Sequence, residues 1–151
     1  MKIHFYQNYR KIPEIEKVIA LIKEQMFAIN SEKSDSAIDE ALKNALMEGK
    51  RALLVLNYSD DDPIGFIFGN IGSGIESGGD YFWINEIHVK KDFRHQGIGS
   101  SMVEALENWL KDRKIMYIAA VTNNQNNLSK GLFHKLNYDI KDLTWIDKNL
   151  L

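Results

Sequence analysis

Apolar side chains recur at helical spacing in three stretches of the chain. Two of the stretches also carry signals that start or end a helix. Pro13 suits the first turn of the first helix, and Ser36 with Asp39 resembles a capping box that opens the second helix, which Gly49 ends. The stretches therefore predict three half-buried helices, whose inward faces are Ile15, Val18, Ile19, Ile22 and Met26; then Ile38, Leu42, Ala45 and Leu46; and then Ile98, Met102, Leu106, Trp109 and Leu110.

Runs of β-branched and aromatic residues predict the strands between and after these helices. The expected strands are residues 2–7, 52–56, 64–68, 81–89 and 115–121, with a last strand or pair over residues 139–146. Residues 60–63 form a turn, and the glycine-rich stretch 69–79 is expected to be a flexible hairpin loop. With one further helix between residues 121 and 139, the element order is βααβββαβαββ, which predicts an α/β fold with a mixed sheet and helices on both faces.

Composition narrows the class of protein. With 151 residues, 44% of them hydrophobic, the chain is expected to form one domain, residues 1–151. A net charge of −2 and a pI near 6.1 show no bias toward nucleic acid. There are no cysteines, and neither a signal peptide nor a membrane span is apparent, so a cytoplasmic protein without a membrane partner is expected.

A glycine motif, Arg94-His95-Gln96-Gly97-Ile98-Gly99, joins the strand ending at Val89 to the third helix. The first turn of a helix has unbonded N–H groups and a partial positive charge, and glycines let a phosphate approach them. No third glycine follows at dinucleotide-fold spacing, and no Lys-Ser or Lys-Thr pair follows as in nucleotide hydrolases. The motif predicts an anion cradle, with a turn that serves packing alone as the alternative.

These residues resemble the acetyl-CoA pyrophosphate loop of the GNAT (GCN5-related) N-acetyltransferases, in which Arg94, Gly97 and Gly99 match the pattern. The resemblance continues upstream, over Ile84–Val89, and downstream, over 121–126 and 128–138. It is strongest from residue 81 to 138. It implies the GNAT fold, acetyl-CoA as co-substrate, no metal, and transfer of an acetyl group to a primary amine.

The resemblance also assigns a cofactor site. The backbone of Ile87, His88 and Val89 is expected to pair with pantetheine, and residues 94–100 are expected to hold the pyrophosphate, namely Arg94, His95, Gln96, Gly97, Ile98, Gly99 and Ser100. Asn126 aligns with an asparagine that hydrogen-bonds the cofactor, although it also suits a helix N-cap. Phe133 stands where a tyrosine commonly protonates the leaving thiolate. A phenylalanine can pack beside pantetheine but has no proton to give.

Two side chains on the central strand are candidates for proton transfer. An amine attacks only when it is unprotonated, so the site needs a proton acceptor. Strand alternation places Ile84, Glu86 and His88 on one face. Glu86 matches the acidic position of the family and is the first candidate for base or amine binding, with His88 second. The structural alternatives are a solvated strand face for Glu86 and a backbone-bonded, partly buried histidine for His88.

The substrate stays open at this stage. The first two helices usually cover the acceptor site in this family. Acidic residues on these helices and their linker suit either a cationic amine or an ordinary solvated surface. They are Glu24, Glu32, Asp35, Asp39 and Glu40. A small-molecule amine is the predicted acceptor. Protein or peptide acetylation and a non-catalytic acetyl-CoA sensor are the alternatives. Phosphate binding through Lys90, Lys91, Arg94 and His95 would indicate a nucleic-acid-binding protein, which the acidity of the chain disfavours. Whether the chain forms a homodimer also stays open.

Overall fold

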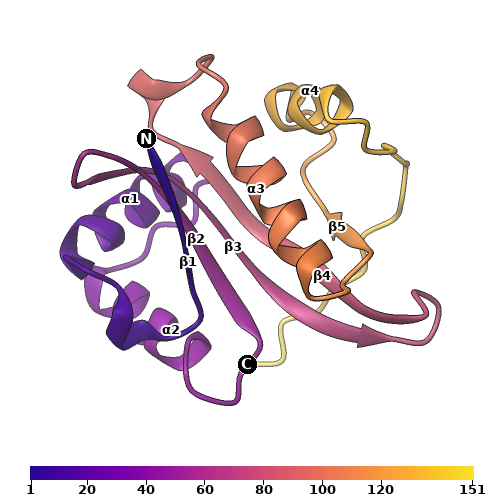
Figure 1. Cartoon of the computed structure of the whole chain (residues 1–151), viewed down its shortest axis with the longest axis horizontal. Coiled ribbons are helices and arrows are strands. Elements are labelled where there is room, and N and C mark those ends of the chain that lie inside the picture. Colours follow the sequence, from indigo (N-terminus) through magenta and orange to yellow (C-terminus); the bar gives the residue numbers. More distant parts are fainter. The chain divides into compact units, whose positions relative to one another are not determined.

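A computed structural model describes all of residues 1–151 (Figure 1). The chain divides into two compact units, residues 1–121 and residues 122–151, which are described separately below. The expectation of a single domain stays a prediction. No helix in the chain combines the length and the apolar character needed to cross a membrane.

The first unit is built on a five-stranded mixed sheet in the order β1-β2-β3-β4-β5. The first four strands pair antiparallel, and the last pairs parallel with β4. The α/β class and mixed sheet expected from the sequence are confirmed. The strands are β1 (Lys2–Tyr6), β2 (Ala52–Ser59), β3 (Asp62–Gly74), β4 (Gly79–Val89) and β5 (Ile118–Ala120).

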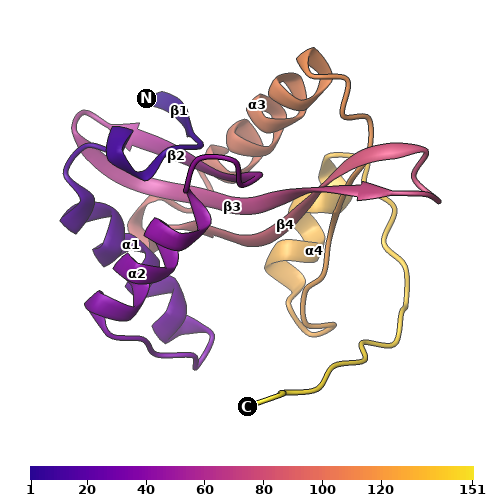
Figure 2. The same cartoon turned by 90° about the horizontal axis from the view of Figure 1, so that it is seen from below.

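Three helices cover this sheet, two on one face and one on the other (Figure 2). They are α1 (Ile15–Ala28), α2 (Asp35–Ala45) and α3 (Ile98–Asp112), with short 3-10 helices at Tyr9–Lys11 and Lys91–Phe93. The predicted capping box is wrong by two residues: Ser34, not Ser36, caps α2 by accepting a hydrogen bond from the backbone N–H of Ala37 at 3.2 Å. Pro13 precedes α1 rather than lying in its first turn.

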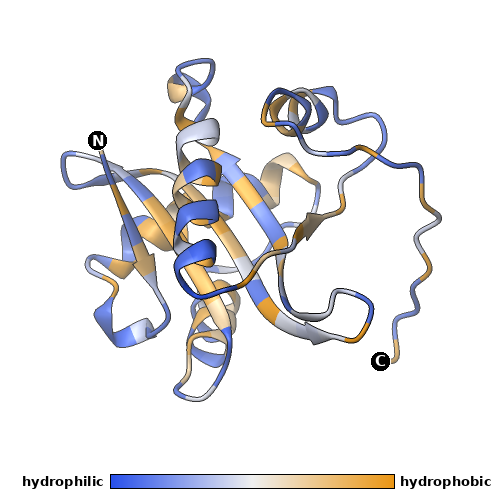
Figure 3. Cartoon of the chain, turned by 45° about the vertical axis from the view of Figure 1, so that its right-hand side comes forward, coloured by the Kyte–Doolittle hydropathy of each residue, from blue (hydrophilic) through white to orange (hydrophobic).

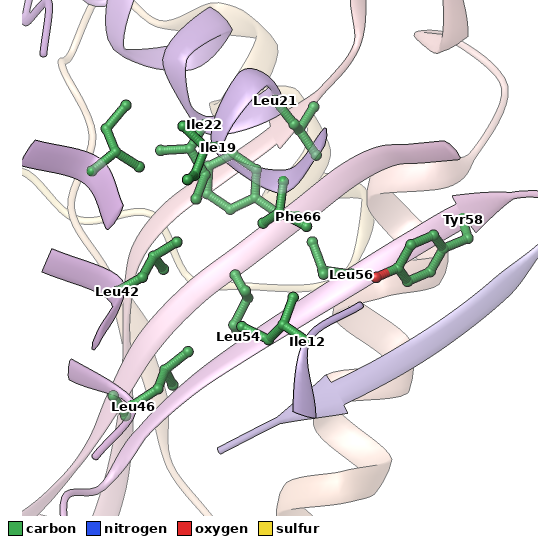
Figure 4. Packing of buried hydrophobic residues seen from close by; sticks show 13 residues of the cluster. Ile12, Ile19, Leu21, Ile22, Leu42, Leu46, Leu54, Leu56, Tyr58 and Phe66 are labelled. Carbon is green, nitrogen blue, oxygen red and sulfur yellow. The ribbon is translucent and has the colours of Figure 1, made fainter. Parts of the chain in front are cut away.

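Apolar packing explains the two helical layers. On one face, side chains of α1 and α2 pack against alternate residues of β2 and β3, among them Leu54, Leu56 and Phe66 (Figure 4). On the other face, Met102 and Leu106 of α3 are fully buried. Figure 3 shows hydrophobic residues along the central strands and both kinds of residue along α3, as expected for a helix with one buried side.

The glycine-rich stretch after Phe68 is strand rather than loop, which corrects the prediction. β3 runs to Gly74 and β4 starts at Gly79, so only a short turn separates them. The glycines suit a close approach between the strands: a Cβ on Gly69 would lie 2.3 Å from the carbonyl oxygen of Trp83. Composition alone suggested flexibility here, whereas the absent side chains make room for the aromatic residues of β4.

The second unit contains one helix, α4 (Asn127–Lys135), and no strand. The strand or strand pair expected over residues 139–146 is therefore absent. The apolar side chains that suggested it are exposed, with Leu143 83% and Ile146 87% accessible. A strand needs a neighbour for its backbone hydrogen bonds, and this unit offers none. β5 is also shorter than predicted, because the chain pairs with β4 only over residues 118–120.

Candidate acetyl-CoA and amine site

The glycine motif forms the start of α3, as the sequence predicts. The first backbone hydrogen bond of the helix runs from Ser101 to the carbonyl of Gly97 at 2.9 Å. The N–H groups of Ile98, Gly99 and Ser100 precede it, so they have no partner within the helix. Gly97 occupies the N-cap position without a capping side chain. This helix end leaves its N–H groups available to an anion.

The conformation of Gly97 suits close approach of a ligand. Its φ of 77° lies in the left-handed region, and a Cβ built on it would meet no atom within 4 Å. Packing inside the protein therefore does not require a glycine at this position, whereas its left-handed backbone conformation does favour one. The anion cradle stays a prediction.

The other motif residues differ in their exposure and in the contacts that they make inside the protein. Arg94 donates from Nε to the carbonyl of Val89 at 2.9 Å, which ties the loop to the end of β4. His95 is exposed and adopts a positive φ of 60°. The Gln96 side chain bonds the carbonyl of Asp92 at 3.3 Å, and the Ile98 side chain is buried. Ile98 can therefore offer an anion its N–H but not its side chain.

One edge of β4 is open beside this loop. β5 pairs only with Phe82–Ile84, so the later part of β4 has no neighbour from β5. The backbone N–H of Lys90 donates to the carbonyl oxygen of Ile64 at 2.8 Å, so the backbone groups of Lys90 point toward β3. By alternation, Ile87 and Val89 direct their backbone groups to the open edge. Main-chain donors and acceptors at this edge can pair with an extended amide-containing chain, although Arg94 already occupies the Val89 carbonyl.

A β-bulge in β4 corrects the predicted facing of Ile84, whereas Glu86 and His88 share one face as predicted. Glu86 pairs with Phe68 while Ile84 pairs with Gly69, leaving Asn85 as the extra residue. Since Phe68 and Gly69 are consecutive and point to opposite faces, Glu86 and Ile84 do too. Ile84 thus does not share the face of Glu86 and His88. Those two side chains lie on the face covered by α1.

Glu86 is a partly buried carboxyl group with no hydrogen-bond or ion-pair partner in the structure. Burial disfavours its charged form and raises its pKa above the ordinary value for glutamate. A raised pKa brings a carboxylate closer to the range in which it accepts a proton efficiently near neutral pH. The environment therefore suits a general base.

His88 is buried, with 7% of its surface accessible, and bonds a side chain rather than the backbone. Its Nε2 lies 3.0 Å from Oε1 of Glu24 on α1. Burial lowers the pKa of His88, the Glu24 contact partly opposes that shift, and the charge of Arg94 adds to it. A neutral imidazole that donates from Nε2 to a carboxylate leaves Nδ1 as an acceptor.

Sequence reasoning named Glu24 only as one of several acidic residues, so it missed the pairing with His88. Helical spacing places Glu24 on the polar side of α1, and a contact between α1 and β4 cannot be read from spacing. Two other members of that acidic set are neutralised. Asp35 pairs with Lys23 at 2.8 Å, and Asp39 pairs with Lys43 at 2.7 Å. The acidic rim is thus smaller than the sequence suggests.

The two remaining predicted residues lie in the second unit. Asn126 caps α4: its Oδ1 accepts from the N–H of Ser129 at 3.1 Å. This is the structural alternative that the sequence left open. Phe133 packs edge-on against Tyr138, with ring centroids 5.0 Å apart. A role in cofactor binding stays a prediction for both residues. No cluster of three or more His, Asp or Glu side chains is arranged to hold a metal ion.

Comparison with known proteins identifies the family. The sequence matches the family model described as Acetyltransferase (GNAT) family over residues 15–138, and the chain belongs to this family. The family implies acetyl-CoA as the co-substrate. The match spans the loop, the open strand edge, Glu86, His88 and most of the second unit. No curated protein sequence matches the chain.

Solved structures share the fold at low sequence identity. An aminoglycoside acetyltransferase from an uncultured soil metagenomic sample is 14% identical with a TM-score of 0.81, covering 99% of this chain and 95% of that one. A ribosomal-protein-alanine N-acetyltransferase from Brucella melitensis biovar Abortus 2308 is 14% identical with a TM-score of 0.78, covering 98% of both chains. An aminoglycoside 6'-N-acetyltransferase from Acinetobacter haemolyticus is 18% identical with a TM-score of 0.73, covering 99% of both. These likenesses establish the fold alone.

Proposed function

We propose that the protein is a single-domain N-acetyltransferase that moves an acetyl group from acetyl-CoA to a primary amine of a small molecule by direct attack. The observation that carries the proposal is a continuous main-chain surface. It begins at the open edge of β4 at Ile87 and Val89 and continues through Arg94 to the unbonded N–H groups at the start of α3. Extended amide groups of pantetheine suit the strand edge, and a pyrophosphate suits the helix end.

Acetyl-CoA supplies an activated thioester. The chain must then hold an amine near it, remove a proton from that amine and exclude competing water. When the amine nitrogen bonds the acetyl carbon, the carbon–sulfur bond breaks, and the proton lost by the amine passes to Glu86, directly or through water. The raised pKa and the absence of a competing partner support Glu86 in this role. His88, neutral and open at Nδ1, is the second candidate acceptor.

The thiolate that leaves must also gain a proton. Phe133, at the position aligned with the family tyrosine, cannot give one. Water or the conjugate acid formed on Glu86 supplies it in this proposal, and the overall reaction yields an amide and free CoA thiol. The same phenylalanine favours the second candidate function, an acetyl-CoA sensor that binds the cofactor without turnover.

Small-molecule amines are the first candidates because aminoglycoside acetyltransferases share the fold. The ribosomal-protein acetyltransferase with the same fold keeps a protein N-terminus as the alternative acceptor.

The test combines binding and turnover in one preparation. Calorimetric titration of acetyl-CoA is followed by thiol release against a panel of polyamines, sugar amines, arylalkylamines, amino acids and peptides. Micromolar binding with amine-dependent thiol release is the expected result. Binding without release from any amine would favour the sensor. Absence of binding would overturn the cradle and the proposed function together.

A further inference from the structure

A groove of about 380 Å³ lies along the outer side of α1 and the segment that follows it. Its volume falls in the range of small-molecule sites. None of its lining residues belongs to the proposed cofactor site. They are Ala20, Lys23, Glu24, Phe27, Glu32 and Lys33.

The groove is connected to the reacting strand by Glu24. This carboxylate accepts the hydrogen bond from Nε2 of His88 at 3.0 Å, while 42% of the Glu24 side chain remains accessible. Glu86 lies two residues before His88 on the same face of β4. A cation bound to Glu24 is thus separated from His88 by one carboxylate side chain.

The charges in the groove favour a ligand with a single positive charge. Lys23 is offset by Asp35 at 2.8 Å, and a neutral His88 leaves the negative charge of Glu24 uncompensated. Glu32 and Lys33 take part in none of the ion pairs of the chain. Two carboxylates and one unpaired lysine leave one net negative charge. The lysine disfavours a polycation, because an additional positive group would be repelled.

Phe27 supplies the apolar part of the site. Its ring is 68% accessible although it lies on a helix whose other large apolar side chains mostly face the core. An exposed ring beside a carboxylate can bind both the hydrocarbon body and the cationic end of an amine. The groove therefore combines one net negative charge with one aromatic contact.

We propose that this groove binds the acceptor substrate and that the acceptor is a small primary monoamine with an aromatic or alkyl body. The ammonium group binds Glu24, the body covers Phe27, and Lys33 discriminates against polyamines. This inference rests on the proposed function and names its substrate class. Phe27 and Lys33 are specificity-determining residues in this assignment, and Glu24 is a substrate-binding residue.

The experiment measures kcat/KM by thiol release with 2-phenylethylamine and with spermidine, together with calorimetric acetyl-CoA affinity. Glu24→Gln keeps an oxygen for His88 but removes the charge, so kcat/KM for 2-phenylethylamine should fall about tenfold or more. Phe27→Ala should lower it about tenfold, and Lys33→Gln should raise kcat/KM for spermidine. Acetyl-CoA affinity should not change in any of them.

Two matched variants outside the groove serve as controls. Glu16→Gln removes the same charge from an exposed position on α1, and Met47→Ala removes an exposed apolar side chain. Both should retain wild-type values for each amine. Binding of 2-phenylethylamine in the presence of CoA, followed by NMR, should weaken in Glu24→Gln and Phe27→Ala but not in the controls, which separates substrate binding from a general effect on turnover.

The outcomes distinguish this inference from the function on which it rests. If wild-type protein binds no acetyl-CoA, the proposed function fails and the substrate assignment fails with it. If acetyl-CoA binds and an amine is acetylated, but Glu24→Gln and Phe27→Ala keep wild-type kcat/KM for that amine, only the groove assignment is overturned. A preference for spermidine over 2-phenylethylamine, or turnover of neither, would overturn the substrate class.

Discussion

Replacing Gly97 by aspartate and, separately, by asparagine separates charge from size at the start of α3. Both residues tolerate the left-handed region better than most, and neither Cβ meets another atom within 4 Å. Each variant should lose about 1 kcal/mol of unfolding free energy from backbone strain at φ 77°. The aspartate should recover roughly 0.3 to 1 kcal/mol of that, because a negative charge at a helix N-terminus is stabilising.

The aspartate variant should, in contrast, bind acetyl-CoA more weakly than the asparagine variant does. A carboxylate about 5 Å from one phosphate charge costs about 3 kcal/mol at an effective dielectric constant of about 20, which corresponds to roughly 100-fold in the dissociation constant. The asparagine variant adds equal bulk without that repulsion. The aspartate variant should therefore fold at least as stably as the asparagine variant and bind acetyl-CoA at least about 100-fold more weakly.

The assay pairs denaturant unfolding with calorimetric titration of acetyl-CoA at low and high salt. The difference in affinity between the two variants should shrink at high salt, because screening weakens the repulsion between partly exposed charges. Equal affinities for the aspartate and asparagine variants would refute the assignment of a phosphate group to the start of α3, whatever their effect relative to the wild-type protein.

Four further outcomes test other parts of the structure. Glu86→Gln should leave acetyl-CoA affinity unchanged and lower thiol release by about 10²-fold or more. Burial raises the folded-state pKa of Glu86, so the protein loses unfolding free energy as pH rises through that pKa. The glutamine variant should therefore unfold at a higher temperature than the wild-type protein at pH 7. An unchanged rate would remove Glu86 from the mechanism. Because the pKa of His88 is lowered in the folded protein, the unfolded chain binds a proton at this histidine first as pH falls. The unfolding free energy should therefore decrease as pH falls from about 7 through 6.5 to the folded-state pKa. Urea titrations at a series of pH values should show that His88→Gln flattens this decrease. Phe133→Tyr should raise turnover without changing acetyl-CoA affinity, and a Tyr variant with wild-type turnover would contradict a role for this position in thiolate protonation. Gly69→Ala should lower the unfolding free energy by several kcal/mol, because its Cβ would lie 2.3 Å from the Trp83 carbonyl oxygen. Gly131→Ala in α4, where a Cβ meets nothing within 4 Å, should raise the unfolding free energy by up to about 1 kcal/mol. Comparable effects of the two substitutions would contradict the close approach of the strands at Gly69.

Local patterns were sufficient to predict the central elements of the fold. The helical spacing of α1, α2 and α3 and the glycine motif before Ile98 depend on neighbours within a few residues, and the structure has all of them. Features that depend on distant partners were missed. The glycines after Phe68 suggested a loop because the aromatic residues that fill their space belong to another strand. The expected strands after residue 138 had the right composition but no strand beside them.

The candidate site follows the same division. The start of α3 could be predicted because a helix end and its glycines are adjacent in sequence. The shared face of Glu86 and His88 followed from alternation, but the facing of Ile84 did not, because the extra residue Asn85 is recognisable only when β4 is paired with β3. The contact between Glu24 and His88 joins residues 64 positions apart, and no sequence period reports it.

The surface proposed for the cofactor consists largely of peptide groups, at the edge of β4 and at the first turn of α3, whereas the groove beside Glu24 is lined by side chains. Most amino-acid substitutions leave a peptide N–H in place, so the cofactor surface can persist through extensive sequence divergence. The groove changes whenever one of its side chains changes. With the proposed assignments, evolution or an engineer can replace the acceptor preference through a few positions on α1 without rebuilding the surface proposed for the acetyl donor.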